Sequence, residues 1–110
     1  MVIQIKPLSV NEAWQGKRFK TKKYKAFEKE MLLRLPKLKL EFEKPLSVEI
    51  TFGFSNILSD IDNPVKPLLD CLQKKYGFND REVYELNVKK QIVKQGKEFI
   101  HFKINEIFNK

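Results

Sequence analysis

Residues 46–54 alternate between apolar and polar side chains along their whole length, and this pattern constrains the fold most strongly. A period of two predicts a β-strand with one buried face. A helical pattern follows the strand, so the sequence predicts a strand–loop–helix unit, with Asn63 and Pro64 at the start of the helix. Pro67 removes an amide near its first turn. The apolar strand positions are Leu46, Val48, Ile50, Phe52 and Phe54, and the helix face holds Val65, Leu68, Leu69 and Leu72.

Four further elements are expected around this unit. Residues 2–5 form a short strand that ends at Pro7, and residues 8–14 form a loop. Apolar spacings of three and four predict a helix over 21–35, capped by Thr21 and stopped by Pro36. After a turn at 76–80, residues 83–93 and 98–105 are expected to pair as a hairpin through Gln95-Gly96. The expected fold class is α/β: one domain over residues 1–110, with helices packed on a mixed β-sheet in β-α-β-α-β-β order.

The charge of the chain indicates its class of partner. The 110 residues include 22 Lys and Arg against 14 Asp and Glu, a net charge of +8. Such an excess favours a polyanion. We expect no membrane partner, because no hydrophobic run spans a bilayer and there is no signal peptide or lipidation motif. The single Cys71 and the single His101 exclude an intrachain disulfide and a zinc site, which fits a cytoplasmic protein.

Two aspartates, Asp60 and Asp62, lie where the predicted strand gives way to the helix. In extended chain, side chains two apart point to the same side, so both carboxylates are expected to face one small volume, with Ile61 toward the core. Adjacent carboxylates raise each other's pKa unless a cation lies between them. Mg²⁺ prefers such oxygen ligands and activates water near a phosphate. Asp80 is expected to return to the same strand end as the third carboxylate.

Lys66 follows Asp62 by four residues, one turn along the predicted helix. Its ammonium group suits the stabilisation of charge on a scissile phosphate. The same residues also fit a structural role, which stays open. Asp and Asn before a helix are common caps, and Asp80 fits a plain turn. Lys66 and Asp70 fit a solvated ion pair.

Basic residues gather before and within the first predicted helix, with Phe19 and Tyr24 between them. Such a run contacts phosphates in nucleic-acid-binding proteins, and an aromatic ring stacks on an unpaired base. A solvated helix face is the alternative. Lys90 shares a strand face with Leu86 and Val88, a position from which it points toward the acidic site. The basic run holds Lys17, Arg18, Lys20, Lys22, Lys23 and Lys25.

The acidic motif resembles the signature of RusA-type Holliday junction resolvases. The resemblance rests on Asp60-Ile61-Asp62-Asn63, Lys66, Asp70 and the run from Gly77 to Val83, and extends loosely to residues 7–11. It implies a small dimeric endodeoxyribonuclease of bacteria and prophages, with a divalent-metal site formed by Asp60, Asp62 and Asp80 and with Lys66 as the essential basic partner. It implies paired nicks across a four-way junction. Asn79 stands where the bacterial archetype has a further acidic residue.

The sequence therefore predicts a magnesium-dependent endonuclease, with Mn²⁺ as a possible substitute, that resolves four-way junctions as a homodimer in DNA recombination and repair. Two alternatives stay open: a less selective phage nuclease for branched DNA, and a basic DNA-binding module without activity. Lys90 and Asn11 resemble a strand lysine and an N-terminal asparagine of the family. The predicted catalytic residues are Asp60, Asp62, Lys66 and Asp80; the predicted DNA-binding residues are Asn11, Lys17, Arg18, Lys20, Lys22, Lys23 and Lys90.

Overall fold

The computed structural model describes residues 1–15, 19–38 and 45–107. It is a small α/β domain with a mixed four-stranded sheet in the order β1-β6-β4-β5 and a separate two-stranded ladder, β2-β3. In chain order the elements are β1 (Val2–Ile3), α1 (Val10–Ala13), β2 (Trp14–Gln15), β3 (Phe19–Lys20), α2 (Lys22–Arg34), β4 (Leu46–Phe54), α3 (Val65–Tyr76), the 3₁₀ turn η1 (Asp80–Glu82), β5 (Val83–Ile92) and β6 (Phe99–Glu106).

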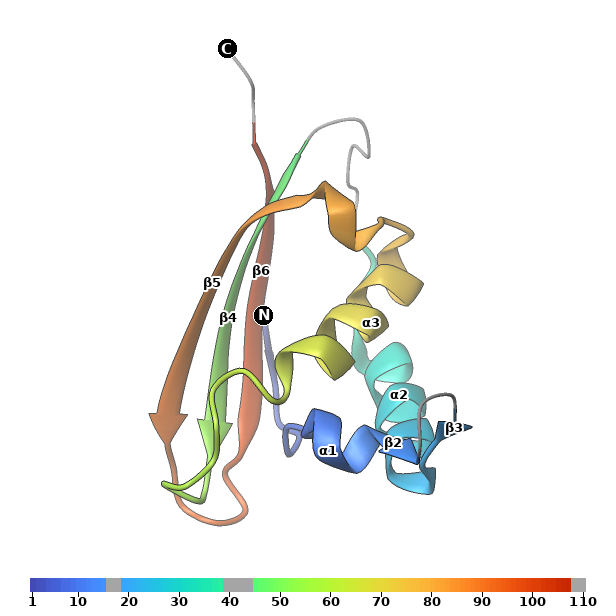
Figure 1. Cartoon of the computed structure of the whole chain (residues 1–110). Helices are drawn as coiled ribbons and strands as arrows, with labels where there is room; N and C mark the ends of the chain where they lie inside the picture. The colour runs from blue at the N-terminus through green and yellow to red at the C-terminus, as the bar shows by residue number, and fades with distance from the viewer. Residues whose placement is uncertain (16–18, 39–44, 108–110) are drawn as a thin grey trace.

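β4 is the strand around which the domain is built. It pairs in parallel with β5 and antiparallel with β6 along nearly its whole length. Its apolar side chains face the helices, which all lie on one side of the sheet (Figure 1). They join buried residues of α2 and α3 in one core, as the alternation in residues 46–54 predicts. The largest of these buried side chains include Tyr24, Met31, Ile50, Phe52, Leu68, Leu72 and Phe102.

Both long helices begin and end where local signals place them. Thr21 caps α2, because its hydroxyl oxygen accepts a hydrogen bond from the Tyr24 amide at 3.1 Å. Pro67 is the third residue of α3, where a backbone amide has no acceptor within the helix, so the proline does not break it. Gly77 ends α3 with a φ of 75°, a left-handed conformation that glycine adopts without strain.

The predicted hairpin between the last two strands is wrong. Both strands exist, but β4 lies between them in the sheet. The α3 crossover places β5 parallel to β4 at one edge, so β6 takes the other edge. The connection from β5 to β6 passes the end of β4, where the Val93 amide donates to the Phe54 carbonyl at 2.7 Å. A period-two pattern identifies a strand but carries no information about its neighbour.

The N-terminal region also differs from the prediction. Residues 10–13 form helix α1 rather than loop, and the first strand spans two residues only. The β2-β3 ladder pairs Trp14 with Lys20, which brings the chain back to the start of α2. With η1, the described order therefore contains four short elements beyond the predicted β-α-β-α-β-β. Elements this short carry no periodicity to read.

Glu28 joins the two long helices and makes stability depend on pH. It accepts hydrogen bonds from Lys20 and from Lys74 of α3, both at 2.9 Å. Burial alone would raise the pKa of Glu28, but the two lysines outweigh it and lower the pKa below its usual value. The two ion pairs of Glu28 should therefore stabilise the folded state fully above the pKa that Glu28 has in the unfolded chain. They should lose this effect as the pH falls through the lower pKa that Glu28 has in the folded protein.

We expect Glu28→Gln to destabilise the protein by about 1–2 kcal/mol at pH 7. The difference from wild type should shrink at acidic pH, as the pH falls through the lowered pKa of Glu28 and the carboxyl group becomes protonated. Urea unfolding at both pH values measures it. An equal difference at both would show that the charge of Glu28 contributes nothing.

Candidate active site

The predicted acidic pair lies on the loop of residues 55–64, which connects β4 to α3. Figure 1 shows this loop turning back from the lower end of β4 toward the middle of the sheet. The loop contains turns at 57–58 and 63–64 and bends at 55 and 61–62. Within it, the Ser59 amide donates to the Asn56 carbonyl at 3.1 Å. At its far end, the Val10 amide of α1 donates to the Asn63 carbonyl at 2.8 Å. The loop is thus held from inside and from α1.

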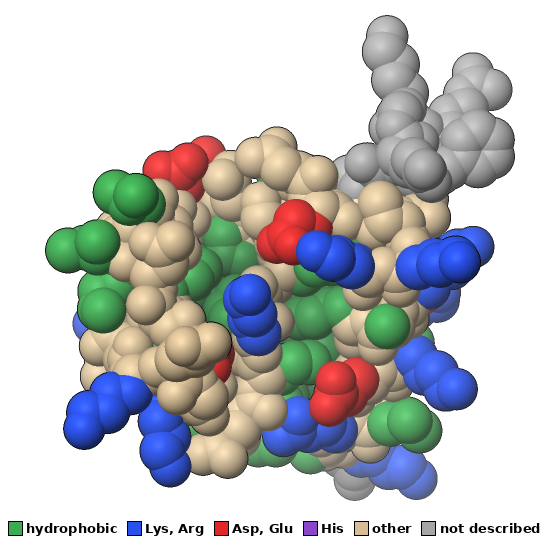
Figure 2. Space-filling view, turned by 90° about the horizontal axis from the view of Figure 1, so that it is seen from below, with side chains coloured by type: hydrophobic (Ala, Val, Ile, Leu, Met, Phe, Trp, Pro, Cys, Tyr) green, Lys and Arg blue, Asp and Glu red, His purple; other side chains and the backbone are tan. Residues whose placement is uncertain are grey.

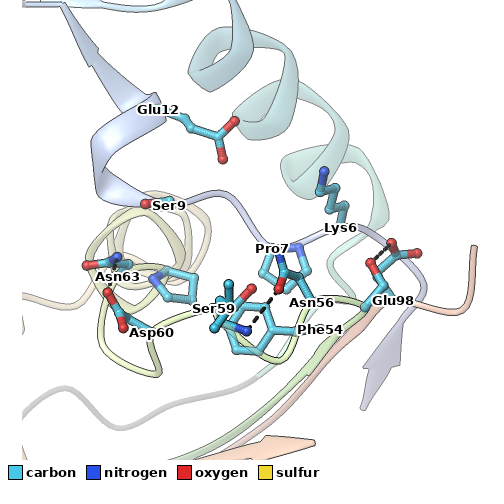
Figure 3. Close-up of a pocket in the computed structure, with 13 residues that line it drawn as sticks. Lys6, Pro7, Ser9, Glu12, Phe54, Asn56, Ser59, Asp60, Asn63 and Glu98 are labelled. Carbon is cyan, nitrogen blue, oxygen red and sulfur yellow. Dashed lines mark hydrogen bonds between the residues drawn. The ribbon is translucent and has the colours of Figure 1, made fainter. Parts of the chain in front are cut away.

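Because the chain bends at residues 61 and 62, the extended geometry expected to point Asp60 and Asp62 to the same side is not present. Asp60 lines a pocket of about 400 Å³ with Ser9 and Asn63 (Figure 3). Asp62 lines a different groove, together with Lys66 of α3 and Leu86 of β5. Ile61, expected in the core, is 40% exposed and lines that second groove. Both aspartates are exposed to solvent.

The Asp60 pocket contains polar groups that the sequence did not single out. Asp60 itself accepts a hydrogen bond from the Asn63 side-chain amide at 3.3 Å. Glu12 of α1 and Glu98, which precedes β6, lie on other sides of the same pocket (Figure 3). These residues come from three distant parts of the chain. No local spacing in the sequence marks them.

Lys66 forms an ion pair with Asp70, one turn further along α3, at 2.8 Å. The other oxygen of Asp70 accepts a hydrogen bond from the Tyr24 hydroxyl of α2 at 3.0 Å. The hydrogen bond to Asp70 raises the pKa of Lys66, and the charges of Asp70 and Asp80 add to this effect. Lys66 therefore carries its positive charge throughout the neutral range. The i,i+4 spacing signals the ion pair, whereas Tyr24 is too distant in sequence to be found.

Asp80 reaches the site from another direction than expected. β4 and β5 are parallel, and Leu46 at the start of β4 lies beside Val83 at the start of β5. Asp80, three residues before Val83, therefore lies near the end of the sheet where β4 begins. Asp60 follows the opposite end, where β4 terminates. It nevertheless lies within electrostatic range of Lys66, whose pKa it helps to raise. Its amide donates to the Gln73 side chain at 3.0 Å. Asn79 caps η1 by accepting from the Arg81 amide, which gives this residue a structural role.

The three carboxylates have the chemistry of a magnesium site but do not form one cluster. Within residues 1–15, 19–38 and 45–107, no group of three His, Cys, Asp or Glu side chains is placed to hold a metal ion. The side chains of Asp62 and Asp80 are exposed, and neither forms a hydrogen bond or ion pair within these ranges. Exposed, unengaged carboxylates are suitable hard-oxygen ligands for Mg²⁺.

The predicted DNA-binding residues fall into four groups. Lys17 and Arg18 lie outside the described residues. Lys20 and Lys23 are engaged within the protein, with Glu28 at 2.9 Å and Glu12 at 3.0 Å, whereas Asn11 and Lys22 are exposed. Lys90 donates hydrogen bonds to two carbonyl groups of the 55–64 loop. Figure 2 shows the end at which β4 and β5 terminate, with Lys and Arg side chains around its rim and a recessed apolar centre.

A thiol mechanism is excluded at Cys71. The side chain is fully buried, and burial raises the pKa of its thiol to about 12. A thiol of this kind stays protonated at neutral pH and has no access to a substrate.

One protein-family model matches nearly the whole chain. A family model described as endodeoxyribonuclease RusA matches residues 5–103. No curated protein matches the chain. In the described part of the chain, no helix has the length and apolar character needed to cross a bilayer.

Proposed function

Since the chain belongs to the RusA endodeoxyribonuclease family, we propose that residues 1–110 form one endonuclease domain. It acts in the cytoplasm, where it resolves four-way DNA junctions by paired, magnesium-dependent nicks. The observation that carries this proposal is the set of acidic side chains around Lys66. This permanently charged lysine shares a groove with the unengaged Asp62 and lies in electrostatic range of the unengaged Asp80. Cation and carboxylates together suit a phosphodiester.

The residues of the site divide between holding the metal and stabilising charge on the phosphate in this mechanism. Asp60, Asp62 and Asp80 would hold Mg²⁺, which supplies a Lewis acid and a water of lowered pKa when bound. Lys66 donates hydrogen bonds to an oxygen of the scissile phosphate and stabilises the negative charge that develops there. Asp70 keeps the ammonium group charged and close to its place on α3. Tyr24 in turn fixes Asp70 from α2.

The basic residues before and at the start of α2 are proposed to follow the phosphate backbone of one junction arm. We expect a combined Lys17→Ala, Arg18→Ala and Lys22→Ala variant to bind DNA more weakly. Its slope of log affinity against log salt should fall by about 0.9 for each duplex-phosphate contact that is lost. Lys20 is left intact, because its loss would also disturb Glu28. Fluorescence anisotropy over a salt series measures the slope.

The control for this prediction is Lys103→Ala. Lys103 is an exposed lysine of β6, in register with Glu49 and not with the apolar positions of β4. Its replacement removes one positive charge away from the proposed DNA surface. An equal effect per charge in both variants would point to unspecific attraction rather than to contacts made by the basic run.

We also propose that the protein acts as a homodimer through the edge formed by β5. On this strand Leu86 and Ile92 are 46% and 47% exposed. Among the described strands, only β4 pairs with β5, so none of them covers its other edge. An uncovered edge strand with exposed apolar side chains is a liability that a second copy removes. A two-fold dimer would present two equivalent sites to the two symmetric scissile phosphates of a junction.

A charge at this edge should separate the subunits. Leu86→Glu is expected to shift the sedimentation coefficient from dimer to monomer, because it buries a carboxylate against the partner's apolar surface. Leu33→Glu is the matched control, since Leu33 is 77% exposed on α2 and lies outside the proposed interface. A dimer that persists in Leu86→Glu would place the interface elsewhere.

The function is tested by incubating the protein with an immobile four-way junction and Mg²⁺, beside linear duplex, flap and fork substrates of matched sequence. Symmetric nicks at the junction alone would support the proposal. Equal cleavage of flaps and forks would identify a less selective nuclease for branched DNA. Tight junction binding without cleavage in either Mg²⁺ or Mn²⁺ would overturn the proposal in favour of a DNA-binding module.

A further inference from the structure

Lys90 contacts the loop that carries the acidic residues. It lies on β5 in register with Phe52, so it stands on the helix-facing side of the sheet, close to the end of β4. Its ammonium group donates to the Ile57 carbonyl at 2.9 Å and to the Ser59 carbonyl. Both acceptors are backbone groups more than thirty residues earlier in the chain. A lysine with three donors is suited to hold two carbonyl groups at once.

The contact lies where the loop needs external support. Ile57 and Leu58 are 73% and 82% exposed, so the first half of the loop gains little from apolar burial. Ser59, one of the two acceptors, directly precedes Asp60. On the other side of the acidic pair, Val10 holds the Asn63 carbonyl. The loop is therefore held by hydrogen bonds on both sides of Asp60 and Asp62: by Lys90 at residues 57 and 59, and by α1 at residue 63.

We propose that Lys90 is a positioning residue, which fixes the path of the 55–64 loop and thereby the places of Asp60 and Asp62, the proposed metal ligands on it. The proposal rests on the proposed nuclease function, and it gives Lys90 a role other than the phosphate contact that its charge suggests. An ammonium group bound to two backbone carbonyls is directed at the protein. Arginine is a poor substitute, since its planar fork is longer and spreads its donors differently.

Hydrogen exchange of the metal-free protein tests the positioning role without any cleavage assay. In Lys90→Met, which keeps most of the aliphatic chain, amides of residues 55–63 should exchange about tenfold faster, because two hydrogen bonds that hold the loop are lost. Lys89→Met is the matched control. It removes the same charge one residue away, on the opposite face of β5. Exchange in β4 and α3 should stay unchanged in both variants.

Junction binding and metal titration complete the test. Lys90→Met should keep the salt slope of junction binding, while the Mg²⁺ concentration at half-maximal cleavage rises several-fold; Lys90→Arg should fall between Lys90→Met and wild type in loop exchange. Unchanged exchange at 55–63 would overturn the proposal, as would a salt slope lowered by about 0.9, the mark of a lost phosphate contact. If the wild type proves inactive, the exchange data still decide the role of Lys90, so the two proposals fail separately.

Discussion

Replacement of Asp62 by asparagine is expected to abolish junction cleavage, with a loss of at least about 10³-fold in rate, while junction binding is kept or strengthened. The change removes one ligand charge from the proposed metal site but keeps the size of the side chain. A bound metal supplies several kcal/mol of stabilisation to the transition state. The same change removes a negative charge near phosphate, which favours binding. Single-turnover cleavage and junction affinity should be measured on the same preparations.

Glu49→Gln is the control for this change. Glu49 is an exposed carboxylate of β4 that alternates with the buried positions and lies away from the 55–64 loop. It should cleave like wild type. Wild-type cleavage by Asp62→Asn would contradict the assigned metal site. Loss of both binding and cleavage, together with a lower midpoint of urea unfolding, would indicate that the fold itself was damaged.

Lys66→Met is expected to lower the cleavage rate by about 10²–10³-fold with little change in junction affinity. This is the usual effect of removing one donor that stabilises charge in a transition state. Lys66 is 57% exposed in its side chain, so its loss should cost little stability. The methionine keeps the apolar length that lines the groove beside Leu86. Saturating single-turnover rates and binding curves separate the two effects.

Lys94→Met removes an equal charge from the exposed turn between β5 and β6 and should leave the rate unchanged. Asp70→Asn provides an intermediate case, because Lys66 keeps its charge but loses its ion-pair partner. Its rate should lie between those of Lys66→Met and wild type. If Lys66→Met cleaved DNA at the wild-type rate, Lys66 would have no catalytic role, and its ion pair with Asp70 would serve only to stabilise α3.

The elements predicted correctly are those in which several local signals agree. Strand 46–54 has strict alternation over nine residues. Helix α2 combines apolar spacing with a Thr21 cap and a terminal proline, and α3 combines apolar spacing with Gly77 at its end. For such segments, local preference and tertiary packing favour the same conformation. Their presence could therefore be predicted before any contact was known.

The neighbours of the strands could not be predicted in the same way. A turn at Gln95-Gly96 between two apolar strands indicates a hairpin, yet β4 separates the two strands. The choice depends on the α3 crossover, which is a property of the whole chain. The acidic motif shows a similar limit. Its residue types indicate the chemistry, whereas the different surroundings of Asp60 and Asp62 depend on turns within the loop.

The partners of the site residues were the least predictable part. Tyr24 meets Asp70 across two helices, and Lys90 meets Ile57 and Ser59 across the sheet. Each contact joins residues that share no local pattern. The i,i+4 pair of Lys66 and Asp70, by contrast, lies within the reach of sequence spacing, as does the contact of Asp60 with Asn63 three residues later.

The place of β4 between β5 and β6 has a consequence for how the chain reaches its native state. The Gln95-Gly96 turn favours early local pairing of β5 with β6, because closing a short loop costs less entropy than bringing distant segments together. That pairing occupies the edges that β4 requires. Productive folding must therefore place β4 between these two strands before they pair with each other, or separate them afterwards. The sheet order that brings Lys90 to the acidic loop thus also leaves the chain with a competing, non-native pairing of β5 with β6 during folding.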